Sequence, residues 1–322
     1  MTPMPRPPVF VPRVLDEPGA IDLLIDRHAP YWPVQRYFAN DAEYAALSGG
    51  ERGAMPVAPV FRGNWATEGE ARDGVETLLH LPRFVAAARE LFDAEIVRPQ
   101  NVYVNLTWQL PFPQGRGHTD VPAFRGFDRT RHPITLLTIM GMSGLFEDVR
   151  TRIATAVAWF YEGTDGGFEY WPGGPDGAPV VHEGAISNTA IVGDNDFMWH
   201  RVRPVGRVED GMPSLTLDSE LVRRDADTWA IRDGAREIAR FPRRQLRISV
   251  SWKAAVFASD EERRRHDEHL DDLTLDEVLR RFADDLRSRG ARVDVPSDPE
   301  RDPSFIATLQ DAYVRYPAAY AA

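Results

Sequence analysis

Three side chains of this sequence have the types and the spacing of metal ligands. His118 and Asp120 lie two residues apart in the stretch GRGHTDVPAFRG, and His200 follows His118 after 82 positions, in NDFMWHRVRPVG. On an extended segment, residues two apart project to the same face, so an imidazole nitrogen and a carboxylate oxygen could reach one ion. A distant strand returning beside this segment would add His200. A His-x-Asp pair also arises by chance, so the pair alone is a weak indication of a metal site.

A second pattern lies in RQLRISVSWKAAVF, near the end of the strand-rich part of the chain. Polar Arg247, Ser249, Ser251 and Lys253 alternate with apolar residues, which is typical of a strand with one polar face. Arg247 and Ser249 on that face could together hold a carboxylate, with the guanidinium binding it in bidentate fashion. The alternative is an ordinary exposed face of an edge strand.

Together these patterns resemble the Fe(II)/2-oxoglutarate-dependent dioxygenase superfamily, over roughly residues 101–257. Two histidines and one carboxylate on one face, with coordination positions left open, form the facial triad of non-haem Fe(II) oxygenases. The segments GGFEYWPGG and VGDNDFMWHRVRPVG are also similar to the family's segments before and around the distal histidine. The resemblance implies that His118, Asp120 and His200 bind Fe(II), and that Arg247, assisted by Ser249, binds 2-oxoglutarate.

The same resemblance implies the reaction. The expected activity is oxidation, most simply hydroxylation, of a C–H bond by O2, coupled to decarboxylation of 2-oxoglutarate to succinate. No side chain is needed as a catalytic acid or base. Asp120 stands where halogenating relatives have a small residue, which favours an oxidation without halide. The expected substrate is a small molecule, with a peptidyl substrate as the alternative.

One departure from the family concerns the arginine. In the family it often follows the distal histidine by about a dozen residues, whereas Arg247 follows His200 by 47. An inserted hairpin would explain the extra length, because surface loops tolerate insertions. Four other arginines are rivals for the cosubstrate: Arg203, Arg207, Arg243 and Arg244.

The elements expected to position these residues run in the order helices, strands, helices. Helical spacing marks the stretches EPGAIDLLIDRHAP and VETLLHLPRFVAAARELFDA, and period-2 alternation begins with NVYVNLTWQL. Strand-like segments follow, including PITLLTIMG and the hairpin IRDGARE. Ser259 with Glu262, and Thr274 with Glu277, form capping boxes that predict two C-terminal helices.

This order predicts an all-β core, a double-stranded β-helix or jelly roll, with flanking N- and C-terminal α-helices. We expect one structural unit with three parts. Residues 1–97 would form an N-terminal arm and helices packed on the barrel. Residues 98–258 would form the catalytic core, with an inserted hairpin near 208–242, and residues 259–322 the C-terminal helices.

The composition limits the classes of partner and of site. A net charge of −11 argues against nucleic acid or an anionic membrane as a partner. The lack of cysteine excludes disulfides, thiolate metal sites and a cysteine nucleophile. No apolar run approaches the about 20 residues of a spanning helix, and the proline-rich start has no signal-peptide core, so we expect a cytoplasmic protein. The oligomeric state is not predicted.

Substrate contacts are expected from Arg125, Trp108 and Trp171. An arginine just after the His-x-Asp pair could hold a substrate carboxylate, and aromatic residues could form the walls of an apolar cleft. Two alternatives to the whole interpretation stay open. One is a cupin-like metal enzyme that does not use 2-oxoglutarate and gives Arg247 no role, and the other is a metal-free jelly-roll binding module.

Overall fold

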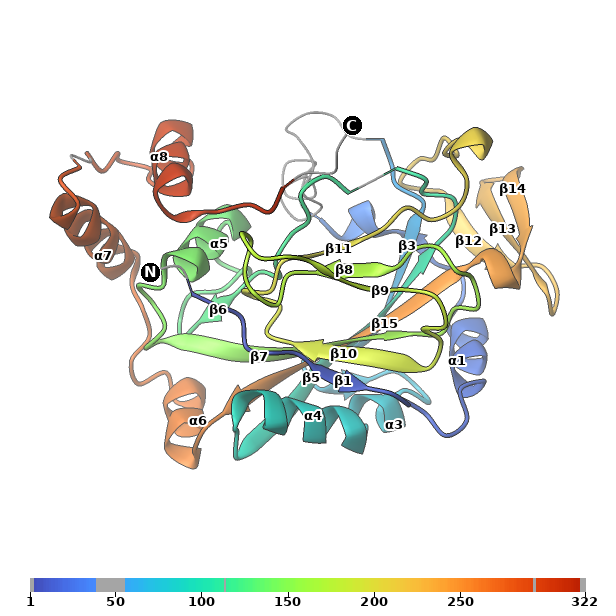
Figure 1. Ribbon diagram of the computed structural model, residues 1–322, viewed down its shortest axis with the longest axis horizontal. Coiled ribbons are helices and arrows are strands. Elements are labelled where there is room, and N and C mark those ends of the chain that lie inside the picture. The colour runs from blue at the N-terminus through green and yellow to red at the C-terminus, as the bar shows by residue number, and fades with distance from the viewer. Residues whose placement is uncertain (1–2, 39–55, 113, 292–293, 319–322) are drawn as a thin grey trace.

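The main element of the fold is an antiparallel sheet of nine strands (Figure 1). The computed structural model describes residues 3–38, 56–112, 114–291 and 294–318. Seven strands follow the order β1-β10-β7-β15-β5-β3-β2, while β4 pairs with β3 and β6 with β7. Their bounds are β1 Val9–Val11, β2 Trp32–Pro33, β3 Val60–Thr67, β4 Glu70–Ala71, β5 Ile96–Thr107, β6 Ala123–Phe124, β7 Arg150–Trp159, β10 Thr189–Gly193 and β15 Arg247–Phe257.

Strand β15 lies in the middle of this sheet, and its alternation has the expected two faces. Ile248, Val250 and Trp252 are fully buried in the largest hydrophobic core. The alternate side chains line a cavity on the opposite face of the sheet; they are Arg247, Ser249, Ser251 and Lys253. Because successive strand residues point to opposite faces, one strand both stabilises the core and presents polar groups to the cavity.

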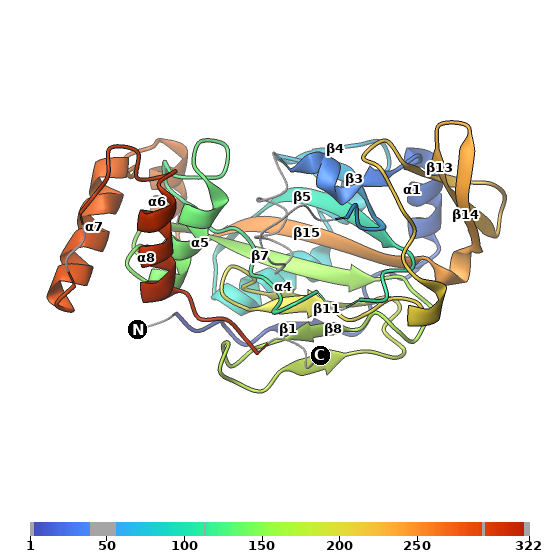
Figure 2. The same cartoon turned by 90° about the horizontal axis from the view of Figure 1, so that it is seen from above.

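Two smaller sheets complete the β structure. The order β11-β8-β9 forms a three-stranded sheet on the side of the main sheet opposite helix α4 (Figure 1). The order β12-β13-β14 forms a second, which lies at one end of the molecule (Figure 2). The bounds are β8 Phe168–Tyr170, β9 Val180–His182, β11 His200–Val202, β12 Glu220–Arg223, β13 Thr228–Asp233 and β14 Arg236–Pro242.

The insertion expected near 208–242 is therefore three strands rather than one hairpin. The predicted hairpin at IRDGARE is confirmed, since β13 pairs with β14 from Asp233↔Arg236 outward. Gly234 in this turn has φ +58°, a conformation that favours glycine. Strand β12 adds to the free edge of β13, and Leu221 in β12 bridges to Tyr31, which ties the insertion to the N-terminal segment.

The helices cover the main sheet and one end of the molecule. Helices α3 and α4 lie on the outer face of the main sheet, while α5, α7 and α8 gather at the end opposite β12–β14 (Figures 1 and 2). The helices are α1 Ala20–His28, α3 Glu76–Leu79, α4 Pro82–Phe92, α5 Ile134–Ser143, α6 Asp260–Asp267, α7 Leu275–Ser288 and α8 Pro303–Tyr313. Three short 3-10 turns are η1 Val34–Tyr37, η2 Val208–Asp210 and η3 Arg243–Gln245.

Both predicted helix starts are confirmed, with Ser259 and Thr274 as the N-cap residues. The Ser259 hydroxyl accepts a hydrogen bond from the Glu262 amide at the start of α6, and Thr274 does the same for Glu277 at the start of α7. The stripe of Val278, Phe282 and Leu286 on α7 is buried in a second hydrophobic cluster. The C-terminal helices therefore pack on the end of the core that carries α5.

The prediction of a strand at PITLLTIMG is wrong, because this segment forms helix α5. Pro133 precedes the helix, and Gly144 ends it in the left-handed conformation. The segment is apolar on all sides and almost entirely buried, so it has neither a period of 2 nor one of 3.6. A short apolar run of this kind does not distinguish a buried strand from a buried helix.

The N-terminal segment does more than pack on the core. Within residues 1–97, β1 pairs with β10, and β3 pairs with β5 over most of its length. The main sheet therefore crosses the boundary expected at residue 97. No helix in the described ranges has both the length and the apolarity needed to cross a bilayer.

Candidate metal centre

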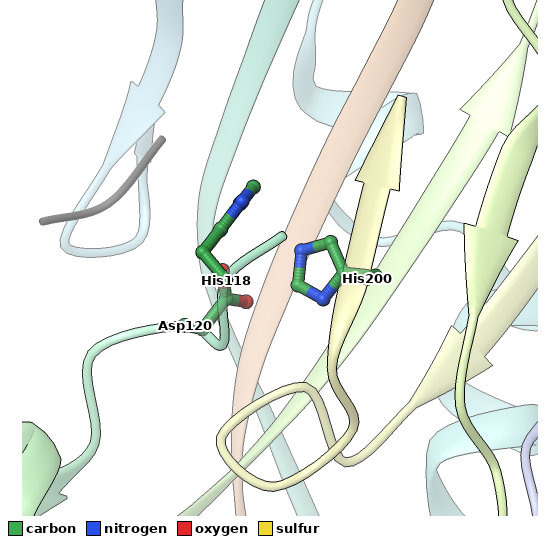
Figure 3. Close-up of side chains that lie close together, drawn as sticks. All are labelled: His118, Asp120 and His200. Carbon is green, nitrogen blue, oxygen red and sulfur yellow. The ribbon is translucent and has the colours of Figure 1, made fainter. Parts of the chain in front are cut away.

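The structure brings His118, Asp120 and His200 together (Figure 3). His118 and Asp120 come from the loop after β5, and His200 begins β11. The two histidines exchange backbone hydrogen bonds, from His118 N to His200 O at 3.0 Å and from His200 N to His118 O at 2.9 Å. One potential ligand atom from each of the three residues lies within 4.8 Å of the others.

The glycine before His118 permits this close pairing. Gly117 has φ +83°, and a Cβ there would lie 2.7 Å from the backbone oxygen of His200. A side chain at position 117 would therefore be strained by the backbone conformation and would also push His118 and His200 apart. The loop places an imidazole beside β11 only because position 117 has no side chain.

Both imidazoles are held in the neutral form that binds metals. The Nδ1 of His200 donates to the Met198 carbonyl at 2.9 Å, which leaves Nε2 with a free lone pair. Burial lowers the pKa of His200. Burial, followed by the neighbouring His200, lowers the pKa of His118 to about 3. The Nδ1 of His118 is buried and has no hydrogen-bond partner among the described residues.

Asp120 is held as a carboxylate with one oxygen to spare. Its Oδ2 accepts hydrogen bonds from Lys253 Nζ at 2.8 Å and from Thr155 Oγ1 at 3.0 Å. Burial alone would raise the pKa of Asp120, but the charge and hydrogen bond of the Lys253 ammonium outweigh it and keep the pKa below its usual range. The backbone N–H of Asp120 donates to the carbonyl of Asn195 at 2.8 Å, which ties the loop to the β10–β11 turn.

These residues fit a divalent transition metal. The set is two neutral imidazoles and one ionised carboxylate, with an orphaned buried nitrogen on His118 that a metal could satisfy. Nitrogen and oxygen donors of this kind suit iron, whereas a closed structural zinc site would need a fourth protein ligand. His118, Asp120 and His200 could thus hold the metal with coordination positions left for other molecules.

The three residues open onto a cavity of about 610 Å³ between the main sheet and the β11-β8-β9 sheet. One wall carries Phe168, His200 and Val202 from the small sheet. The main sheet supplies four neighbouring strands to the opposite wall, and its lining residues include Arg62 (β3), Tyr103 and Asn105 (β5), Ser249, Ser251 and Lys253 (β15) and Thr155 (β7).

Arg247 and Ser249 line the same cavity. Arg247 is 2% exposed, its Nε donates to the Gly166 carbonyl at 2.6 Å, and its Nη1 lies 3.4 Å from Ser249 Oγ. Burial lowers the pKa of Arg247 to about 10. No carboxylate in the described ranges lies within ion-pair distance of this guanidinium. Gly166 has φ +63°, and a Cβ there would lie 2.6 Å from Arg247 Cδ.

The four rival arginines lie elsewhere. Arg203 pairs with Glu183 at 3.1 Å on the surface, and Arg243 pairs with Asp22 at 2.6 Å. Arg207 pairs with Glu209 and Arg244 is exposed. None of the four lines the cavity.

The three residues expected to contact substrate do not line the cavity. Arg125 is buried and forms a bidentate pair with Asp271, at 2.5 and 2.8 Å. Trp108 stacks on Phe241, with ring centroids 4.2 Å apart. Trp171 is buried, and the guanidinium of Arg201 lies 4.9 Å from its ring. These side chains hold structural elements together, so the substrate contacts expected of them are not supported.

The alternation of β5 explains the position of Trp108. From residue 101 to the end of β5, the residues that face the cavity are the odd-numbered Asn101, Tyr103, Asn105 and Thr107, so Trp108 shares the side of Val104 and Leu106. The polar face of this strand was visible in the sequence and could have identified Tyr103 and Asn105. Arg62 was missed because the segment VFRGNWAT, which forms β3, lies in a region expected to be helical.

Comparisons with known proteins give a likeness in structure only. No protein-family model matches the sequence, and no curated protein matches it. Among solved structures, HygX from Streptomyces hygroscopicus with nickel, 2-oxoglutarate and hygromycin B bound is 12% identical, with 78% of this chain and 83% of that chain covered and a TM-score of 0.40. A prolyl-4-hydroxylase from Pseudomonas putida is 14% identical, with 78% and 93% covered and a TM-score of 0.36.

A third match is an oxidoreductase of the 2OG-Fe(II) oxygenase family from Burkholderia pseudomallei. It is 12% identical, with 67% of this chain and 80% of that chain covered and a TM-score of 0.32.

Proposed function

We propose that this protein is an Fe(II)/2-oxoglutarate-dependent oxygenase that oxidises a C–H bond of a small organic molecule. One observation carries the proposal. A group of two neutral histidines and one carboxylate opens onto the same cavity as a buried arginine that has no carboxylate partner in the described ranges. A metal enzyme of the cupin-like kind would explain the first feature but would give Arg247 no role.

In this proposal His118, Asp120 and His200 hold the iron. A metal and 2-oxoglutarate bound there would supply the coupling of substrate oxidation by O2 to decarboxylation of 2-oxoglutarate, with one oxygen atom entering succinate, the other entering the substrate, and CO2 released. Lys253 and Thr155 hold Oδ2 of Asp120, so Oδ1 is the oxygen available to the metal. The Met198 carbonyl fixes the tautomer of His200.

Arg247 and Ser249 would bind the distal carboxylate of 2-oxoglutarate. The Nε of Arg247 donates to the Gly166 carbonyl, which orients the guanidinium. Nη2 and the second N–H of Nη1, which also contacts Ser249 Oγ, are then available to an anion. A bound carboxylate would also supply the counter-charge that this buried side chain lacks, and an unpaired buried charge is costly. No side chain acts as a general acid or base in this scheme.

The architecture supports the same proposal. Two antiparallel sheets that face one another across a cavity fit a double-stranded β-helix, in which a site lies between the sheets. A cavity of about 610 Å³ lies in the range of small-molecule sites, which favours a small substrate over a peptide.

Consumption of 2-oxoglutarate tests the proposal directly. Protein loaded with Fe(II) is incubated with 2-oxoglutarate and O2, with ascorbate as the reductant in place of a substrate, and succinate is measured. We expect succinate from the wild type, none from His118→Ala, and at least about tenfold less from Arg247→Ala, since charged hydrogen bonds contribute about 1.5–3 kcal/mol. Iron-loaded wild-type protein that leaves 2-oxoglutarate unconsumed would overturn the proposal.

A further inference from the structure

Arg62 is a second cavity arginine that the proposed mechanism does not use. It lies on β3, and its Nε donates to Asn105 Oδ1 of the neighbouring β5 at 3.0 Å. Its guanidinium lies over the ring of Tyr103, 4.3 Å from the centroid. No acidic group in the described ranges lies within ion-pair distance of it. Burial, the largest influence, lowers the pKa of Arg62.

The position of Arg62 separates it from the expected cosubstrate site. In the sheet register Arg62 pairs with Asn105, and Asn105 pairs with Ser249. Arg62 and Ser249 are therefore two strands apart, about 10 Å at the usual strand spacing. Both face the cavity that also contains His118 and Asp120. One wall thus presents two separate cationic points to a single chamber.

The charges of the cavity leave Arg62 unmatched. The chain has a net charge of −11, yet beside Arg129 the described residues of the lining include three basic side chains, Arg62, Arg247 and Lys253, and only two acidic ones, Asp120 and Asp128. Lys253 pairs with Asp120, and Asp128 accepts hydrogen bonds from Thr130. If Arg247 binds 2-oxoglutarate, Arg62 is left without a counter-charge among these residues, and an anion of another molecule could supply it.

We propose that Arg62, positioned by Asn105 and Tyr103, binds a carboxylate of the organic substrate. The inference rests on the proposed function and names its substrate class, an organic acid. Asn105 engages Nε, so the two Nη groups remain as a fork that matches the two oxygens of a carboxylate. The Tyr103 ring holds the plane of the guanidinium. A single fork suits a carboxylate better than a phosphate, which usually meets several cations or backbone N–H groups.

The test compares organic acids with their neutral analogues. Wild-type protein loaded with Zn(II) and 2-oxoglutarate is screened by saturation-transfer NMR against a panel of carboxylic acids, the matching primary amides and the matching phosphate monoesters. We expect acids to bind at least about tenfold more tightly than their amides, as a charged hydrogen-bond pair requires. Arg62→Gln should remove this preference, and Arg62→Lys should restore only part of it.

Arg36→Gln serves as the matched control. Arg36 is exposed and also stacks on an aromatic ring, with its guanidinium 5.4 Å from Trp32, but it does not line the cavity. This variant should keep the preference of the wild type. A wild type without a preference for acids, or Arg62→Gln with an unchanged preference, would overturn the inference. Tighter binding of phosphate monoesters than of acids would also overturn it.

A second measurement separates this inference from the proposed function. Binding of 2-oxoglutarate to the iron-loaded protein should persist in Arg62→Gln and weaken in Arg247→Gln. The preference for acids should instead be lost in Arg62→Gln and persist in Arg247→Gln. If the wild type selects acids through Arg62 but does not bind 2-oxoglutarate, the proposed function fails while the acid site stands. If it binds 2-oxoglutarate but shows no preference for acids, only the inference about Arg62 fails.

Discussion

At the scale of single residues, the charge next to the candidate metal ligands is unusual. Lys253, the only lysine of the chain, lies 2.8 Å from Asp120, with side chains that are 20% and 14% exposed. In the absence of a metal this ammonium is the counter-charge of the carboxylate. A bound divalent ion would be a second and stronger counter-charge for the Asp120 carboxylate. If Asp120 binds the metal as we propose, the pair links the stability of the protein to metal binding.

Lys253→Met should destabilise the metal-free protein and increase the stabilisation gained from metal. Loss of the ammonium leaves a largely buried carboxylate with only the Thr155 hydroxyl, at a cost of about 1–3 kcal/mol after allowance for partial exposure. Metal would replace the missing charge. We would measure melting temperatures with and without Zn(II), using Thr155→Val as the control that removes a neutral hydrogen bond. An unchanged metal-free melting temperature would contradict this account of the pair.

The sequence predicted the candidate metal ligands better than it predicted which side chains contact one another around them. His118, Asp120 and His200 belong to a spacing that is visible in one dimension. The contacts of Lys253 and Arg62 depend on which strands become neighbours in the main sheet, and no local pattern contains that information. Arg125 shows the same limit, because its partner Asp271 lies 146 residues away.

At the scale of elements, the turn between β10 and β11 fixes the position of the loop that carries Asp120. The Asn195 carbonyl accepts the hydrogen bond of the Asp120 amide, and the flanking Asp194 and Asp196 pair with Arg150 at 3.0 and 3.3 Å. All of these groups are buried. Two acids against one arginine leave Asp196 imperfectly paired, and its Oδ1 has no hydrogen-bond partner among the described residues.

This pairing predicts a dependence of stability on pH. Burial, together with Asp194 and against the pull of Arg150, raises the pKa of Asp196 to about 7 from an ordinary value near 3.8. Between these two values the unfolded chain releases the proton that the folded protein keeps. The contribution of Asp196 to stability therefore falls as the pH rises from about 4 to about 7.

Asp196→Asn should remove this contribution. The difference in stability between Asp196→Asn and the wild type should favour the variant more at pH 8 than at pH 5. Urea midpoints of both proteins at both pH values measure this difference. Asp311→Asn, which changes an exposed acid on α8, is the control and should follow the wild type at both pH values. A difference between Asp196→Asn and the wild type that is the same at pH 5 and pH 8 would show that Asp196 does not titrate in this range.

At the scale of the whole molecule, alternation predicted the strands that carry the site but not the full extent of the sheet. The polar and apolar faces of β5 and β15 are readable because each strand separates a core from a cavity. Helix α5 was misread because it is buried on every side and has no polar face to reveal its period. The pairing of β3 with β5 is a long-range contact that periodicity alone cannot predict.

We propose that one cavity binds a metal through His118, Asp120 and His200 and 2-oxoglutarate through Arg247. Anaerobic titration with Fe(II) and then 2-oxoglutarate, followed by the visible metal-to-ligand charge-transfer band, tests both parts at once. We predict a band in the wild type that is lost in His200→Ala, weakened in Arg247→Ala and unchanged in Arg203→Ala, the surface rival. An iron-loaded wild type that shows no band on addition of 2-oxoglutarate would mean that the cavity does not bind 2-oxoglutarate at the metal.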